Sequence, residues 1–371
     1  MRNFYLSSVF LLFLALTSCR SVNEIRFTAG HEAFRTFGLV VQQEEATELV
    51  SSASGVEFRF SGSSCRVLLS NQASGGDYNY AVFELDGNYH SRVRVDQADP
   101  VEFEIMAGDS AKEHLLRIYK ATEAQNGLLL FHGANCENIL TAETNYTLKI
   151  EFVGNSITCG MGNDVQEIPC ESGKWLDQHN AWYSYASLTA RALNAEPLLS
   201  SVSGAGIYRA WNSDQPTVPS LYWSAYLNSD SLLKRDFSKW KPDLIVVALG
   251  TNDLSRGDGT TTRAPFDSAR FVREYLQFID TLSGVQPQAR FVMLTSPMVS
   301  GENEELLFRC LLEVQTAFSE KYPGAQKPEI HRFPPITATG CSGHPNKEEH
   351  RLMAESLTDF LKNLLLTPEK S

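Results

Sequence analysis

The change in hydrophobic periodicity near residue 143 limits the possible folds of this chain more than any other feature. Before it, apolar and polar residues alternate in short runs such as 56–60, 92–95 and 101–105. Alternation with a period of two predicts antiparallel strands that bury one face. We therefore expect residues 19–143 to form an all-β sandwich, with a jelly roll as the favoured form.

Beyond residue 143, the apolar residues come in continuous runs separated by segments of helical spacing. The continuous runs predict parallel strands buried on both faces, at 147–153, 196–202, 243–249 and 290–295. The helical spacing predicts helices at 181–194, 265–282, 302–322 and 346–366. Strands that alternate with helices indicate a doubly wound α/β domain over residues 144–371, with its ligand site at the carboxyl ends of the strands.

The first residues have the composition of a secretory signal. Arg2 precedes the apolar stretch 9–16, and Thr17-Ser18-Cys19 follows. We expect residues 1–18 to be removed as a signal peptide and the protein to be exported. The run Leu16-Thr17-Ser18-Cys19 also resembles the lipobox of bacterial lipoproteins. Cys19 would then carry lipid and anchor the protein to a membrane, facing the periplasm or the cell surface. The alternative is an ordinary signal peptide in which Cys19 is incidental.

Charge and cysteine content limit the partners of the chain. The formal net charge of −12 becomes −13 when Arg2 leaves with the signal, because residues 1–18 carry no acid. Such a protein has no basic surface for nucleic acid, so neutral or weakly charged substrates fit better. No Cys-x-x-Cys pair is present, which argues against a structural zinc site. In an exported chain the other cysteines can form up to three disulfides, and the sequence leaves open the pairing among Cys65, Cys136, Cys159, Cys170, Cys310 and Cys341.

Small and polar residues follow three of the expected strands and precede the last expected helix. These segments are Gly154-Asn155-Ser156-Ile157-Thr158, Ser203-Gly204-Ala205-Gly206, Gly250-Thr251-Asn252-Asp253 and Gly340-Cys341-Ser342-Gly343-His344-Pro345. A hydroxyl at the carboxyl end of a buried strand is where an α/β enzyme exposes a nucleophile. Ester cleavage also needs a base and donors aimed at the oxygen that becomes negative. Together the four segments contain residues of all these types.

The four segments resemble the ordered blocks of the SGNH (GDSL-like) hydrolases, over roughly residues 147–366. The resemblance implies a flavodoxin-like three-layer α/β/α domain. It also implies that Ser156 is the nucleophile and His344 the base. The backbone amides of Ser156 and Gly204, with the side chain of Asn252, would form the oxyanion hole, and no metal or other cofactor is needed.

Within that group the chain is similar to carbohydrate esterase family two, which joins a jelly roll to a C-terminal SGNH domain. The blocks that carry this similarity are 154–162, 203–209 and 340–345. Members of this family remove acetyl groups from plant polysaccharides. The resemblance therefore implies an acetylated polysaccharide or oligosaccharide, such as xylan or glucomannan, as substrate.

Two positions depart from the usual SGNH pattern. Asn155 stands where many members have Asp, and it can still form hydrogen bonds locally. Cys341 replaces the usual Asp three residues before the histidine, and a neutral thiol cannot stabilise an imidazolium as a carboxylate does. Some members of the resembled family orient their histidine through a backbone carbonyl. We expect the same for His344, unless a carboxylate such as Asp253 or Glu348 contacts its ring.

Three aromatic residues that lie after strands or near the expected pocket are candidates for stacking on a sugar ring. Trp211 is the preferred one because it follows the glycine loop, and Tyr208 and Trp182 are the others. Burial in the core is the alternative for each of them. Isolated tyrosines in the β domain, such as Tyr78 and Tyr80, more often fill a core than bind sugar, which favours a supporting role for that domain.

The predicted function is that of a monomeric, exported serine esterase that deacetylates carbohydrate. Alternatives on the same scaffold are a lipase or a peptidoglycan O-acetyl esterase, and an alternative of another class is a non-catalytic glycan-binding lipoprotein. The Gly-x-Ser-x-Gly motif of ordinary α/β-hydrolases is absent. Metal-dependent deacetylases carry a pattern like His-x-x-x-His-Pro, in which Gly340 replaces the first histidine here.

Overall fold

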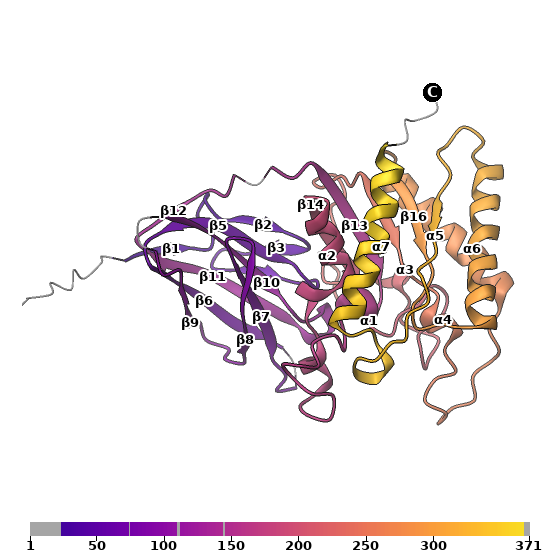
Figure 1. The fold of residues 1–371 in the computed structure, drawn as a ribbon, viewed down its shortest axis with the longest axis horizontal. Helices are drawn as coiled ribbons and strands as arrows, with labels where there is room; N and C mark the ends of the chain where they lie inside the picture. Colours follow the sequence, from indigo (N-terminus) through magenta and orange to yellow (C-terminus); the bar gives the residue numbers. More distant parts are fainter. Residues whose placement is uncertain (1–23, 74, 110–111, 144, 367–371) are drawn as a thin grey trace, which may run out of the picture.

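The computed structural model describes residues 24–73, 75–109, 112–143 and 145–366. The expected signal peptide, residues 1–18, and the candidate lipidation site Cys19 lie outside these residues. A β-sandwich occupies one side of the molecule and an α/β domain the other (Figure 1). No helix among the described residues is long and apolar enough to cross a membrane.

The N-terminal part is a sandwich of two antiparallel sheets, and strands that follow one another mostly change sheet, as in a jelly roll. One sheet has the order β3 (Val40–Gln42), β4 (Thr47–Leu49), β11 (Leu128–Cys136), β6 (Ser64–Gln72), β9 (Val101–Met106), with β1 (Ile25–Thr28) paired to β11. The other has the order β12 (Asn138–Leu140), β5 (Gly55–Ser61), β10 (Glu113–Lys120), β7 (Asn79–Leu85), β8 (Asn88–Val95), with β2 (Arg35–Phe37) paired to β5.

The inward faces of the two sheets form the core of the sandwich. Four of its phenylalanines, Phe58, Phe60, Phe83 and Phe131, are fully buried. A disulfide joins Cys65 of β6 to Cys136 of the neighbouring strand β11. The alternation in the sequence therefore predicted this half correctly, because a strand that buries one face places every second residue in the core.

The C-terminal part contains a five-stranded parallel sheet in the order β14-β13-β15-β16-β17. Its strands are β13 (Leu148–Gly154), β14 (Ala195–Ser201), β15 (Leu244–Val247), β16 (Arg290–Leu294) and β17 (Glu329–His331). This is the flavodoxin-like order, in which the chain turns to opposite sides of the first strand. The first four strands were expected. Strand β17 was not expected, because its three residues lie between prolines and charged residues and carry no hydrophobic pattern.

Helices cover both faces of this sheet. On one face lie α2 (Tyr185–Ala192) and α7 (Lys347–Leu366), and on the other α5 (Ser268–Val285) and α6 (Glu302–Lys321). Short helices are α1 (Ser156–Cys159), α3 (Val218–Leu221) and α4 (Thr251–Leu254), and single 3₁₀ turns are η1 (Ala124–Asn126), η2 (Trp175–Gln178), η3 (Ala181–Tyr183) and η4 (Cys341–Gly343). The helix expected at 181–194 is interrupted, because Ser184 accepts the Ala186 amide and caps a new helix after η3.

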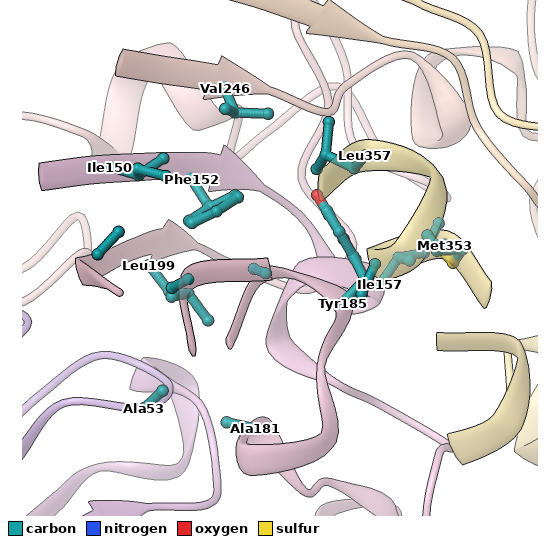
Figure 2. Close-up of a cluster of buried hydrophobic side chains, with 14 of the residues drawn as sticks. Ala53, Ile150, Phe152, Ile157, Ala181, Tyr185, Leu199, Val246, Met353 and Leu357 are labelled. Carbon is teal, nitrogen blue, oxygen red and sulfur yellow. The ribbon is translucent and has the colours of Figure 1, made fainter. Parts of the chain in front are cut away.

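The two domains share one apolar cluster (Figure 2). Ala53 of the sandwich belongs to the same cluster as Phe152 of β13 and Tyr185 of α2. Polar contacts add to it: the hydroxyls of Tyr78 and Tyr80 both donate to the carboxylate of Asp177, at 2.9 Å. The tyrosines that were expected to fill a core are thus buried at the interface between the domains.

Candidate active site

Ser156 lies at the carboxyl end of β13, the strand between β14 and β15 from which the chain continues to both sides of the sheet. It is the first residue of α1, and the side chain of Asn155 caps this helix by accepting the Ile157 amide at 3.2 Å. Asparagine therefore serves the local geometry at this position, as expected. Gly154 is required, because a Cβ there would lie 2.1 Å from Oγ1 of Thr158.

The ring of His344 contacts the Ser156 hydroxyl. Oγ of Ser156 lies 2.7 Å from Nε2, and the other ring nitrogen, Nδ1, lies 3.3 Å from the carbonyl oxygen of Ser342. With the proton on Nδ1, the ring donates to that carbonyl and Nε2 accepts from the serine. Burial lowers the pKa of His344 to about 4, so the imidazole is neutral at pH 7 and able to take a proton.

The ring partner is thus a backbone carbonyl, as the sequence predicted, and the two candidate carboxylates lie elsewhere. Asp253 accepts the backbone amides of Ile207 and Tyr208, at 3.0 and 2.9 Å. Glu348 pairs with Arg351 on the surface of α7.

One sequence-based interpretation was wrong. Cys341 was treated as a neutral thiol, but it forms a disulfide with Cys170, over a separation of 171 residues. The bond joins the segment 162–180 to η4, three residues before His344. The remaining cysteines of the described residues, Cys159 and Cys310, are buried and free.

Two of the three candidate oxyanion donors follow the strands that flank β13, and the third is the amide of Ser156 itself. Gly204 follows β14 and has φ of +77°, and a Cβ there would lie 2.8 Å from the indole of Trp211. Asn252 follows β15, and one hydrogen of its amide is donated to the Ala205 carbonyl at 2.9 Å. Its second amide hydrogen is available to a ligand. The structure therefore brings Ser156, Gly204, Asn252 and His344 to one place.

These four residues line a pocket of about 820 Å³. Two indoles border it, Trp211 and Trp175, with exposed fractions of 44% and 45%. Its other lining residues include Gln125 of the sandwich, Met298 and Asn303. Polar and apolar side chains both line the pocket, which suits a ligand with both apolar and hydroxyl surface.

Two of the three aromatic candidates for sugar stacking were wrong. Tyr208 is 4% exposed and packs in the core, and its hydroxyl accepts the Asp267 amide at 3.0 Å. Trp182 lies between the domains, where its indole donates to Glu84 at 2.8 Å and stacks under Arg191. Neither residue lines the pocket.

Sequence reasoning missed Trp175 and Gln125. Trp175 lies in the segment between α1 and α2, far from every recognised block, and the disulfide and the interface bring it to the pocket. Gln125 lies in a sandwich turn with no motif around it. For Trp175, the only signal in the sequence was the length of the segment between Ser156 and the next helix.

Comparisons with known proteins identify the family of the chain. Residues 152–354 match the model of the GDSL-like lipase/acylhydrolase family. The chain belongs to that family. Residues 38–142 match the N-terminal domain model of carbohydrate esterase 2, so both halves fit the resemblance that the sequence motifs carry.

The names of its relatives all include an esterase activity. The cellulase/esterase CelE of Acetivibrio thermocellus is 32% identical over 85% of this chain, which spans 37% of the length of CelE. An acetylxylan esterase/glucomannan deacetylase of Cellvibrio japonicus is 27% identical over 77% of this chain and 79% of that protein.

A solved structure of a family two carbohydrate esterase from Clostridium thermocellum, in complex with cellohexaose, has the same fold. Its TM-score is 0.78 at 28% identity, and the match covers 90% of this chain and 99% of that one. A family two esterase from Cellvibrio japonicus, at 23% identity and a TM-score of 0.80, shares the fold over 92% of this chain and 98% of that one.

Proposed function

We propose that this protein is a serine esterase that removes O-acetyl groups from carbohydrate. The observation that carries the proposal is the 2.7 Å contact between Oγ of Ser156 and Nε2 of a neutral His344. A hydroxyl next to an unprotonated imidazole is an activated nucleophile. The pocket around it is also lined by the candidate oxyanion residues Gly204 and Asn252 and by two indoles, which supports an acetylated sugar as ligand.

The proposed reaction has two halves. Ser156 attacks the acetyl carbonyl while Nε2 of His344 takes the hydroxyl proton. The negative oxygen of the tetrahedral intermediate is bound by the amides of Ser156 and Gly204 and by the side chain of Asn252. His344 then donates the proton to the sugar oxygen, the C–O bond breaks, and an acetyl-enzyme remains.

Water completes the cycle. His344 takes a proton from a water molecule, which attacks the acetyl-enzyme, and returns it to Ser156 as acetate leaves. The Ser342 carbonyl keeps Nδ1 protonated throughout, which holds the tautomer that each step needs. A carbonyl dipole stabilises the imidazolium less than a carboxylate would. The Cys170–Cys341 disulfide supports the dyad in another way, by holding the loop that carries Ser342 and His344.

The proposed substrate is an acetylated plant polysaccharide or oligosaccharide such as xylan or glucomannan. The names of the Cellvibrio relatives support this class. The exposed rings of Trp211 and Trp175 support it independently, since an indole can stack on a sugar face.

We further propose an exported, monomeric lipoprotein anchored through Cys19. The two disulfides, Cys65–Cys136 and Cys170–Cys341, support export because such bonds persist in oxidising compartments. Radiolabelled palmitate incorporated into the wild-type protein, but not into a Cys19→Ala variant, is the expected result for the anchor.

The test of the proposed function is acetate release from acetylated xylan and glucomannan by the soluble mature protein, in the presence of a chelator. Ser156→Ala should abolish release, whereas Ser229→Ala, at an exposed serine remote from the pocket, should leave it unchanged. Faster cleavage of long-chain acyl esters would favour a lipase, and release from acetylated peptidoglycan alone would favour that substrate. A folded protein that binds these glycans and cleaves no ester would contradict the proposal.

A further inference from the structure

One turn of the β-sandwich reaches the edge of the catalytic pocket. It connects β10 to β11 and contains η1. Two of its side chains contact Ser203, the residue before the candidate oxyanion glycine. Nε2 of Gln125 donates to the Ser203 carbonyl at 2.7 Å, and Oε2 of Glu123 accepts the Ser203 amide at 2.7 Å.

The contact with the carbonyl fixes the direction of an oxyanion donor. The Ser203 carbonyl and the Gly204 N–H belong to the same peptide group, which is planar and trans, so they point in opposite directions. Holding the carbonyl on one side therefore aims the N–H to the other. A hydrogen bond to the carbonyl also polarises the peptide, which strengthens its N–H as a donor.

Glu123 is firmly held in the interior. It is fully buried, and Nε2 of the equally buried His179 lies 3.3 Å from Oε1. Burial alone would raise the pKa of Glu123, but the histidine and the Ser203 amide hold that pKa below its usual range. The ammonium of Lys120 donates to the Glu123 backbone carbonyl. This side chain is therefore a rigid anionic anchor for the Ser203 amide.

The peptide group between Gly204 and Ala205 is also held by a hydrogen bond. The amide of Trp211 donates to the Gly204 carbonyl at 2.8 Å. Glycine is needed at 204, since its φ is positive and the indole lies directly against it. Because glycine is the most flexible residue, external contacts must define where its amide points.

We propose that Gln125 and Glu123 of the β-sandwich are positioning residues for the Gly204 oxyanion amide, so that the sandwich is part of the catalytic machinery rather than only a support. This inference rests on the proposed esterase function. Neither side chain touches the reacting atoms. Gln125 acts on the Ser203–Gly204 peptide directly, and Glu123 acts through the preceding Val202–Ser203 peptide by holding its N–H.

The test compares Gln125→Met with Gln97→Met. Methionine matches glutamine in length but cannot donate to the Ser203 carbonyl, and Gln97 is an exposed sandwich residue away from the pocket. Removing an oxyanion donor outright costs about 10²–10³ in kcat, so misaiming one should cost about 10-fold. With a small activated acetyl ester, we expect kcat to fall by that factor in Gln125→Met and KM to change less than about 2-fold.

A tetrahedral inhibitor separates this role from general destabilisation. Trifluoroacetone adds to the serine hydroxyl to give a charged hemiketal, so its inhibition constant should rise about as much as kcat falls. The thermal midpoint of Gln125→Met should equal that of Gln97→Met. Glu123→Gln should show the same kinetic pattern, and Glu84→Gln is its matched control, since Glu84 is also buried between the domains but does not contact Ser203.

The outcomes are distinguishable. If the wild type has Ser156-dependent activity and Gln125→Met retains both kcat and inhibitor affinity, the positioning role is wrong and the esterase function stands. Loss of kcat in Glu84→Gln as large as in Glu123→Gln would also refute it, because any buried change would then suffice. If the wild type shows no Ser156-dependent activity, both proposals fall.

Discussion

The titration of His344 offers a quantitative prediction, because burial lowers its pKa to about 4 from an ordinary 6.5. The base must be neutral to accept the Ser156 proton. Activity should therefore be constant through neutral pH and fall only when the pH approaches the lowered pKa. An exposed histidine in the same role would lose activity two and a half pH units higher.

The difference is large at pH 5. A histidine with a pKa of 6.5 is about 3% neutral there, whereas one with a pKa of about 4 is about 90% neutral. The rate at pH 5 should thus be close to its value at pH 7. If the pKa of His344 were 6.5, the rate at pH 5 would be about 25-fold lower than the rate at pH 7.

The assay is kcat/KM for an activated acetyl ester between pH 3.5 and pH 8, since this ratio reports on the free enzyme. Acid unfolding must be measured in parallel by circular dichroism. The buried His350 has its pKa lowered to about 3, so the unfolded chain binds its proton first. Its contribution to stability is complete above pH 6.5 and is lost as the pH falls toward 3. A half-maximal rate near pH 6.5 in a fully folded protein would refute the reasoning.

Two further predictions concern the surroundings of the dyad. Cys170→Ser removes a cross-link over 171 residues, and the entropy that the unfolded chain regains should lower the free energy of unfolding by about 5 kcal/mol, so the thermal midpoint and kcat should both fall. The control is Cys310→Ser, at a free buried cysteine, which should leave kcat unchanged. An unaltered midpoint in Cys170→Ser would contradict this reasoning. Trp211→Ala should raise KM for acetylated glucomannan several-fold while leaving KM for a small ester unchanged, and equal effects on both substrates would rule out stacking.

The layout of the catalytic domain could be predicted because its signals are local. A buried parallel strand is a continuous apolar run, and each run ended where the structure places a polar segment of the pocket. Ser156, Gly204 and Asn252 follow from this rule together with the family motif. The short strand β17 could not be found, since three residues carry no period.

The aromatic residues show where local signals fail. Tyr208 and Trp211 both lie close to the glycine loop in the chain, yet only Trp211 lines the pocket, and Trp182 does not line it either. Which face an aromatic side chain takes depends on partners far along the chain, such as Glu84 for Trp182 and Asp267 for Tyr208. Trp175 was missed for the same reason, because a disulfide and the sandwich position it.

The apolar cluster and the Asp177 contacts have a consequence for how such enzymes are assembled by gene fusion. The match to CelE runs over 320 residues and includes both halves of this chain. If the α/β half were transferred alone, Asp177 would lose the Tyr78 and Tyr80 hydroxyls, and the shared apolar surface would face water. The sandwich and the α/β domain are therefore expected to be transferred together. Exchanging the sandwich of one relative for that of another would require the surfaces of the two domains to match.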